Sequence, residues 1–480
     1  MHTITPPLRF QVEGGRRSGM PVLGLLYPSV TLARLGDPLE VARSTASTLP
    51  ADVSRVRAEV DRRVRAALSA LPDPEGTRDE RWYWAAPFAL DRLHDGDEQL
   101  EFQRMMRRWG DEDVEDATTR LVEHVAEAAS FDVADLGARP DDLADVLTDL
   151  ALAGPGVAAL RALSRVSGGG DVLADVHVRE SASIVSWGLR SLFNRPEIIS
   201  ILRSETDGRL PYWRRVLRHC VEGNLQSVLD EYAHVLTESE GLQDTAGAER
   251  AAEISAVMAD AASIRTVRNA MDDVVIDEAG IRLEQRHLRA HFAMRFGRAA
   301  TEDDATQREG KVRVAFNSPF WPFVLASTSV GQEGLDFHTY CHAVMHWNLP
   351  GNPVDLEQRE GRVHRYKGHA VRRNVAERHH GAAFHAIVDD PWFAMFLAAA
   401  ERRPAGESEV YPYWIFTEGT AKIERHIALA PLSTESSRYR QLQKSVGLYR
   451  VAIGQARQED LVTLAGEGQD LSWMQLDLTP

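Results

Sequence analysis

The chain has 480 residues, of which 44% are hydrophobic and 26% charged, and its formal net charge is −16 at pH 7. This length allows about three domains with a sizeable core, and the composition is that of a soluble globular protein. The negative charge argues against a generally basic nucleic-acid-binding protein, but it leaves room for a local basic track, because phosphate contacts dominate affinity.

Cysteine content and hydropathy point to the cytoplasm. Cys220 and Cys341 are the only cysteines, which is too few for a disulfide framework and suits a reducing compartment. The first 15 residues lack the apolar stretch of a signal peptide, and no apolar run approaches the ~20 residues that span a bilayer. We therefore expect a cytoplasmic protein without a membrane partner.

The leading segment, residues 1–48, contains one apolar run, Val22–Tyr27, which predicts a strand. Gly14 and Gly19 have the spacing of a phosphate-binding loop. The two positions that must then be Lys and Ser or Thr are Met20 and Pro21, so the cation and the magnesium ligand are missing. No other candidate for this loop occurs in the sequence.

Residues 49–275 have a helical pattern and are predicted to form an accessory region. Val53, Val56, Val60 and Val64 follow the 3.6-residue period of an amphipathic helix, and Leu71 extends the same stripe. Further helices are predicted at 97–109, 114–130 and 141–153, then from 155 to 166 and from Pro196 onward, with a linker at 168–170.

Residues 276–390 are predicted to form an α/β domain. A capped helix is expected at 301–316. After it, two apolar runs of strand length, Phe323–Thr328 and Ala343–Leu349, each lead into a polar, glycine-bearing segment. This alternation is typical of a parallel sheet, and ligands bind such sheets where loops leave the carboxyl ends of strands.

The segment after the second strand predicts a helix with a charged face. Asn352 and Pro353 have the positions of an N-cap and a first helical residue. Gln358, Arg362 and Arg365 would then project from one face. Two guanidinium groups on one face suit phosphate oxygens, but a solvated helix with internal ion pairs explains the same pattern.

Four sequence elements together resemble the carboxyl-terminal lobe of superfamily 2 helicases, in its remodeller-like branch. Gln358-x-x-Gly361-Arg362-x-x-Arg365 resembles motif VI, and Ser327-Thr328 followed after five residues by Gly334-Leu335-Asp336 resembles motif V. Trp347-Asn348-x-Pro350 resembles a W-N-P element with one extra residue, and Phe316-Asn317 resembles the F-N pair that precedes the motif V strand. The order and spacing agree over roughly residues 290–390.

The resemblance implies a RecA-like parallel-sheet lobe that contributes to an ATP site. It implies that Arg362 and Arg365 are arginine fingers, that Gln358, Gly334, Asp336 and Gly361 belong to the ATP side, and that Thr328 and Ser329 contact the nucleic-acid backbone. Lys367, Arg372 and Arg373 lie in residues 355–378, which have seven basic and four acidic side chains, a net charge of +3, and we expect these three to contact phosphates as well.

Two other sets of residues invite a catalytic or metal-binding interpretation. Asp230-Glu231-Tyr232-Ala233-His234 resembles the acidic box that holds magnesium in these helicases, but the histidine falls one residue late and the surrounding leucines have helical spacing. A solvated helix face is the better interpretation. His338, His342 and His346 have zinc-ligand spacing only on a helix, and a turn and strand are predicted there, so we expect no metal site.

The last region, residues 391–480, is predicted to brace the lobe. Pro391 follows Asp389-Asp390 and opens an apolar helix, Tyr411–Phe416 has the pattern of a strand, and Tyr439, Leu442, Val446 and Tyr449 mark a late helix.

The function implied is that of the carboxyl-terminal lobe of an ATP-dependent DNA helicase or translocase. Its ATP and magnesium would be held through a separately encoded amino-terminal lobe that carries the phosphate loop and the acidic box, unless the reading frame is truncated. Two other interpretations remain: an inert nucleic-acid-binding module, or an interaction scaffold built on the helical region.

Overall fold

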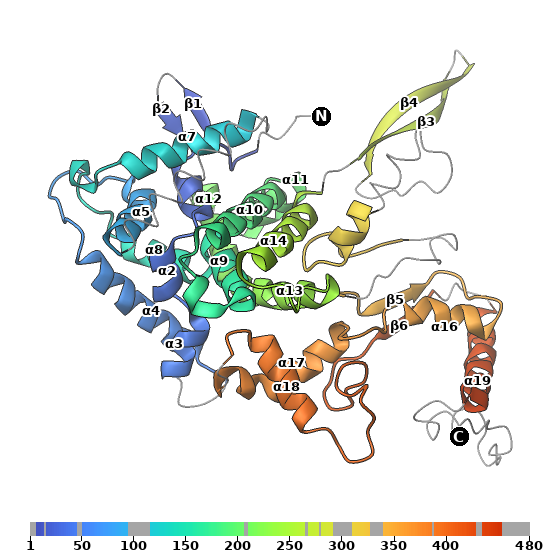
Figure 1. The fold of residues 1–480 in the computed structure, drawn as a ribbon. Coiled ribbons are helices and arrows are strands. Elements are labelled where there is room, and N and C mark those ends of the chain that lie inside the picture. The colour runs from blue at the N-terminus through green and yellow to red at the C-terminus, as the bar shows by residue number, and fades with distance from the viewer. Residues whose placement is uncertain are drawn as a thin grey trace. The chain divides into compact units, whose positions relative to one another are not determined.

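The computed structural model describes residues 6–13, 16–45, 50–94, 116–205, 210–264, 267–277, 280–290, 310–326, 339–385, 388–428 and 434–453 (Figure 1). The chain divides into two units. The first, called the helical unit, comprises residues 1–295, 299–323 and 379–401, and the second, called the motif unit, comprises residues 296–298, 324–378 and 402–480.

Most elements of the helical unit are helices, as the sequence predicts. They are α1 (Met20–Leu26), α2 (Val30–Leu35), α3 (Pro38–Thr45), α4 (Val53–Leu68), α5 (Trp82–His94), α7 (Asp116–Ser130), η1 (Val133–Asp135), α8 (Leu143–Ala153), α9 (Pro155–Ser167), η2 (Gly169–Val172), α10 (Val176–Phe193), α11 (Pro196–Glu205), α12 (Tyr212–Glu222), α13 (Leu225–Ser239), α14 (Gly247–Ser263) and α18 (Pro391–Glu401). Residues 310–316 are also helical, which confirms the described part of the helix expected at 301–316. The helix expected at 97–109 lies outside the described residues.

The core of this unit is built around α9, which contacts α8, α10, α13 and α14 (Figure 1). Pro155 at its first turn is pre-organised for a helix, and almost every residue of α9 is buried. One stretch, Leu143–Ser167, is long and apolar enough to cross a membrane by composition, contrary to the expectation that no such run exists, but 83% of it is buried inside the protein. Such burial is typical of a core helix.

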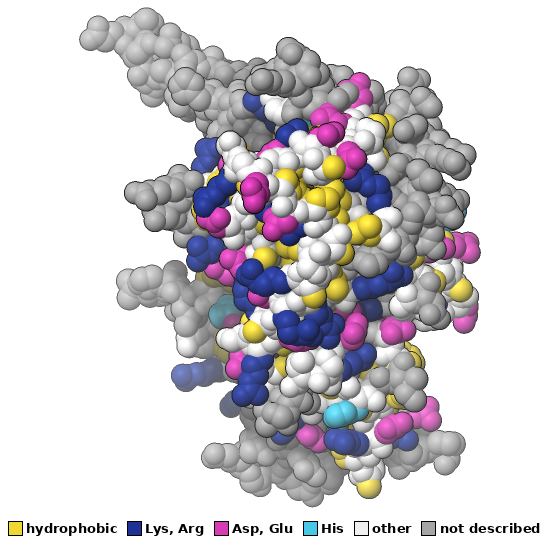
Figure 2. Space-filling view, turned by 90° about the vertical axis from the view of Figure 1, so that its left-hand side faces the viewer, with side chains coloured by type: hydrophobic (Ala, Val, Ile, Leu, Met, Phe, Trp, Pro, Cys, Tyr) yellow, Lys and Arg dark blue, Asp and Glu magenta, His cyan; other side chains and the backbone are white. Residues whose placement is uncertain are grey.

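The amphipathic stripe of α4 is confirmed, with one exception. Val56, Val60 and Val64 are buried, whereas Val53, at the first position of the helix, is 80% exposed. The opposite face of α4 carries ion pairs such as Arg62 with Glu59. Among the side chains coloured by type in Figure 2, basic and acidic groups are likewise interspersed.

Two predictions for the helical unit are wrong. The expected strand Val22–Tyr27 is helix α1, because an apolar run that is buried all round has no period to separate strand from helix, and Pro21 near its start favours the helix. The helical region predicted to reach residue 275 ends earlier. β3 (Val267–Asp277) and β4 (Gly280–Ala290) form a long antiparallel hairpin there, and β1 (Gln11–Glu13) and β2 (Arg16–Ser18) form a shorter one.

The motif unit contains a small parallel sheet with helices beside it. β5 (Ala343–His346) pairs in parallel with β6 (Glu424–Ile427). The strand expected at Ala343–Leu349 is therefore confirmed over its first four residues. The other elements are α16 (Pro353–Gly361), α17 (His369–His385), of which residues up to Arg378 belong to this unit, and α19 (Glu435–Ile453).

A hydrophobic core joins the late helix to the rest of this unit. Leu442 and Val446 of α19 pack with Leu349 and with Leu356 of α16, and all four side chains are buried. Ile427 of β6 packs against the same cluster. Helix α19 therefore holds α16 and the sheet together by burial of apolar surface.

Two predicted strands are absent from the described parts of their ranges. Residues 323–326 form no strand, and Phe323 and Val324 are 72% and 83% exposed; residues 327 and 328 lie outside the described residues. Tyr411–Phe416 forms turns instead. Tyr411 and Phe416 are buried and their rings stack at 5.4 Å, so the apolar pattern there reports side-chain packing, while Pro412 lacks the N–H that a strand ladder needs.

Candidate functional site

Helix α16 begins as the sequence predicts but ends sooner. The side chain of Asn352 accepts a hydrogen bond from the backbone N–H of Asp355 at 2.8 Å, and Pro353 occupies the first turn. The helix ends at Gly361, so Arg362 is its C-cap and Arg365 follows a turn. This corrects the expectation that Gln358, Arg362 and Arg365 share one helix face.

The side chains around this helix end are partly accessible to solvent. Gln358 is exposed, and Arg362 and Arg365 are half-buried. A guanidinium N–H of Arg365 donates to the carbonyl of Gly361, which folds the arginine back against the end of the helix. A methyl group at Gly361 would come no nearer than 3.9 Å to Arg365, so this chain's own packing does not require glycine there.

A polar bridge, which we call the Glu360 bridge, ties α16 to both strands and to α19. Glu360 accepts hydrogen bonds from His346 of β5, at 3.1 Å, and from the guanidinium of Arg425 of β6. Arg425 also donates to the hydroxyl of Tyr439 of α19 at 2.9 Å. Burial alone would raise the pKa of Glu360, but the bonds from His346 and Arg425 outweigh it and lower the pKa from 4.5 to about 2.

The sequence does not predict this bridge. It suggests His346 only as a possible zinc ligand, and it predicts no strand at β6, because the residues of Glu424–Ile427 are mostly polar and exposed. One feature of the sequence points to the bridge. Glu360 is the single acidic residue within the motif VI segment, next to Gly361 and Arg362.

The segment before α16 is anchored by its backbone carbonyls. Arg359 of α16 donates to the carbonyl of Asn348 at 2.9 Å, and Arg438 of α19 donates to that of Pro350 at 3.4 Å. The side chain of Trp347 is 81% exposed. The tryptophan-asparagine element is therefore held in place through its main chain while the indole faces solvent.

The three basic residues that were expected to contact phosphates differ in how exposed their side chains are. Arg373 is exposed. Lys367 is 6% exposed, with its ammonium 5.7 Å and 5.5 Å from the ring centres of Tyr366 and Tyr413. Arg372 is 1% exposed and donates to the carbonyls of Lys367 and Thr339, both at 2.7 Å.

Burial argues against direct phosphate contact by Lys367 and Arg372 and gives them a packing role, which corrects the expectation for these two. Thr328, Ser329, Gly334 and Asp336 lie outside the described residues.

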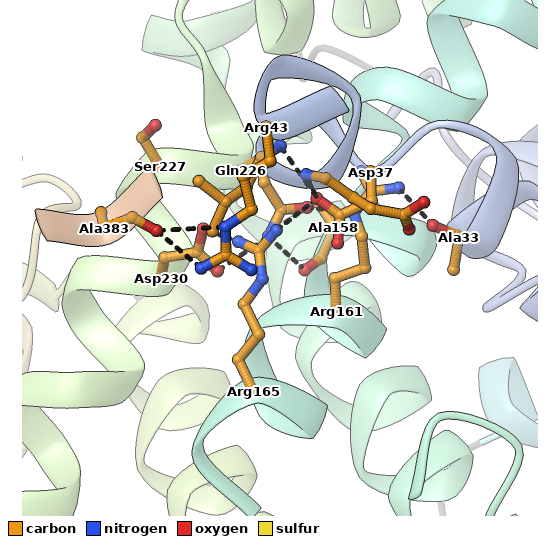
Figure 3. Close-up of polar contacts among 12 residues, drawn as sticks. Ala33, Asp37, Arg43, Ala158, Arg161, Arg165, Gln226, Ser227, Asp230 and Ala383 are labelled. Atoms are coloured by element: carbon orange, nitrogen blue, oxygen red, sulfur yellow. Dashed lines mark hydrogen bonds and ion pairs between the residues drawn. The ribbon is translucent and has the colours of Figure 1, made fainter. Parts of the chain in front are cut away.

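Residues Asp230–His234, which resemble the acidic box, lie on helix α13, as predicted, but all of them except Glu231 are buried, so they do not form a solvated helix face. Asp230 of α13 is 7% exposed and forms an ion pair with Arg165 of α9, which also binds Asp37 at 2.6 Å (Figure 3). Gln226 bridges Asp230 at 2.9 Å and Arg161 at 2.6 Å. Burial raises the pKa of Asp230 to about 6 although Arg165 opposes the shift.

This network lies beside a pocket of about 260 Å³ that is lined by residues of α2, α3, α9 and η2, including Arg34, Arg43 and Arg161. Arg43 donates to the carbonyl of Ala383 at 2.6 Å, as Figure 3 shows. The guanidinium of Arg161 donates hydrogen bonds to Gln226 and to backbone carbonyls of α2 and α8. The buried charges thus satisfy one another, which indicates a structural role.

Within the described part of the chain, no three His, Cys, Asp or Glu side chains lie where they could hold a metal ion. His346 is 2% exposed and bonds to Glu360, His342 is exposed, and His338 lies outside the described residues.

Comparison with known proteins bears on the same segment. Residues 282–367 match the helicase conserved C-terminal domain. This match supports the presence of a helicase C-terminal domain in the chain. The matched range begins within β4 and includes β5 and α16, and thus Gln358, Gly361, Arg362 and Arg365. No curated protein and no solved structure matches the chain.

The match supports a helicase-type, nucleic-acid-binding function, and the small parallel sheet of β5 and β6 is consistent with a RecA-like lobe.

Proposed function

We propose that this chain supplies the carboxyl-terminal lobe of an ATP-dependent DNA helicase or translocase of the remodeller-like branch. The observation that carries the proposal is the match of residues 282–367 to a helicase C-terminal domain, which includes the end of α16. There Arg362 caps the helix and Arg365 bonds to Gly361, so both arginines are held close to one helix end.

In this proposal the ATP site is composite. The sequence has no phosphate loop with its Lys and Ser or Thr, so an amino-terminal lobe would cradle the phosphates and hold Mg²⁺. Arg362 and Arg365 would act on charge that develops on the transferred phosphoryl group, with Gln358, Gly361, Gly334 and Asp336 on the same side. The Glu360 bridge would keep the helix end in position.

Nucleic-acid contact would come from a smaller set than the basic residues suggest. Arg373 is exposed and is retained in that role, together with Thr328 and Ser329. The positive charge of residues 355–378 supports an anionic partner, because each phosphate contact releases a counterion.

The proposal is tested by supplying an amino-terminal lobe in trans and measuring steady-state ATP hydrolysis beside DNA binding at matched salt. Arg362→Ala or Arg365→Ala should lower kcat by roughly two orders of magnitude, toward the range known for arginine fingers. DNA affinity should change much less, and Arg→Lys should not rescue, because an ammonium lacks the planar fork of donors.

The matched control is Arg378→Ala, since that arginine is 54% exposed on α17 and pairs only weakly with Glu418, at 3.7 Å. Its turnover should stay within a few-fold of the unmodified chain. Unchanged turnover of the Arg362 and Arg365 variants together with a loss of DNA affinity would place those arginines on the DNA track and refute the ATP-site role.

A further inference from the structure

Three aromatic side chains of the motif unit gather immediately after the motif VI residues. Tyr366 follows Arg365 in sequence, while Tyr413 and Trp414 come from a distant loop. The rings of Tyr366 and Tyr413 stack at 5.7 Å with 18° between their planes, and Trp414 meets Tyr366 edge to face at 6.2 Å. We call these three residues the aromatic platform.

The backbone under the platform is held in an uncommon conformation. Lys367 has φ of 45°, in the left-handed region that side chains other than glycine seldom adopt. Its N–H donates to the carbonyl of Tyr413 at 2.7 Å, and the ring of His364 bonds to the carbonyl of Trp414 at 3.1 Å. These two bonds join the segment after α16 to the loop that carries the other rings, so the platform is preformed.

The platform is partly open to solvent, and its motif VI side is basic. Tyr366 is 42% and Trp414 is 39% exposed. The basic residues beside Tyr366 are Arg365 and the buried Lys367, and residues 355–378 carry a net charge of +3. The loop that carries the other two rings has three acidic residues, Glu407, Glu409 and Glu418. Exposed aromatic rings beside cationic side chains are the combination by which proteins bind single-stranded nucleic acid.

We propose that the aromatic platform stacks on an unpaired base of a single nucleic-acid strand. The proposal deepens the nucleic-acid-binding part of the proposed function and does not depend on ATP chemistry. Every base has a π face, so such contact tolerates many sequences, while the positive charge of residues 355–378, on the Tyr366 side of the platform, attracts the phosphates that bring the base there. A paired duplex base is already stacked on both faces and cannot use the platform.

The experiment compares the affinity of the full chain for three fluorescent probes at one salt concentration. The probes are a thymidine oligonucleotide, an abasic oligonucleotide of the same length, and a duplex. We expect the unmodified chain to bind the thymidine strand about tenfold or more tightly than the abasic strand, since stacking contributes that much per base. Tyr366→Ala and Trp414→Ala should each remove most of this preference without changing affinity for the abasic strand.

Control variants separate stacking from folding. Tyr366→Phe and Trp414→Phe keep a ring and should retain the preference, whereas Phe393→Ala removes an aromatic side chain that is 49% exposed on α18 and should have no effect. Equal loss of affinity for the thymidine and abasic strands in the alanine variants would overturn the proposal, because it would indicate a packing or phosphate role.

Three further outcomes also decide the matter. If the unmodified chain binds thymidine and abasic strands equally, or binds only the duplex, base stacking is refuted while nucleic-acid binding stands. If it binds none of the three probes, the nucleic-acid-binding part of the proposed function fails as well. Loss of affinity for a fluorescent ATP analogue in Tyr366→Ala, with strand binding unchanged, would assign the platform to the nucleotide and refute the strand contact.

Discussion

The Glu360 bridge should control how firmly α16 is held in the motif unit. Glu360→Gln keeps the shape of the side chain but removes the charge that accepts from Arg425 and His346. Since Arg425 is only 33% exposed, it would then lose its counter-charge in a place where water compensates incompletely. We therefore expect α16 to open more readily in this variant.

The size of the effect follows from the pKa of Glu360. Its fall from 4.5 to about 2 means that the structure favours the charged carboxyl by about 3 kcal/mol, at about 1.4 kcal/mol per pKa unit. Because the folded pKa is depressed, the native state holds fewer protons than the unfolded chain between pH 4.5 and 2. This contribution is complete above pH 4.5 and is lost as the pH falls toward 2.

Native-state hydrogen exchange of α16 measures this opening locally, which matters because a chain with two units need not unfold in one step. Exchange of the α16 amides in Glu360→Gln should be roughly 30- to 150-fold faster at neutral pH, the equivalent of about 2 to 3 kcal/mol. Glu409→Gln, at an exposed position of the same unit, is the control and should change exchange little. Unaltered exchange of α16 in Glu360→Gln would refute the reasoning.

Three further predictions concern both units. Asp230→Ala should cost about 3 kcal/mol of stability in chemical denaturation, because it removes one of the two carboxylates that pair with the buried Arg165 and leaves Asp37 as the other. Glu231→Gln should cost far less, and equal stability of the two variants would contradict the buried pair. The isolated chain should show no ATP turnover above background, and nucleic-acid-stimulated turnover that Arg365→Ala abolishes would overturn this expectation. Gly419→Ala should lower the melting temperature of the motif unit, since φ there is 122° and a methyl group would lie 2.4 Å from a side-chain oxygen of α17; an unchanged melting curve would count against that packing.

Local sequence patterns were sufficient wherever one short-range preference acted alone. The cap Asn352 and the helix starts at Pro155 and Pro196 follow from the fixed φ of proline and the side-chain oxygen of asparagine. The stripe Val56–Val64 follows from helical periodicity. The motif VI spacing likewise predicted a helicase C-terminal domain, because motif spacing is carried by the chain itself.

Tertiary packing decided the features in which two distant segments meet. The run Val22–Tyr27 is helical, and the sequence does not show this, because an apolar run that is buried on all sides has no polar residues whose spacing separates a helix from a strand. The polar residues of β6 form a strand only because β5 provides its hydrogen-bonding partner.

Tertiary packing also explains the burial of three charged residues, Lys367, Arg372 and Asp230, which the sequence alone does not predict. Asp230 forms an ion pair with α9, Arg372 donates to backbone carbonyls, and Lys367 lies beside two tyrosine rings. A charge can leave water only where such partners converge, and their convergence depends on residues far away in the chain. The sequence alone therefore determined the helices with a clear period or cap and which motif is present, while the tertiary structure decided the state of the buried apolar run and which charges are available to a ligand.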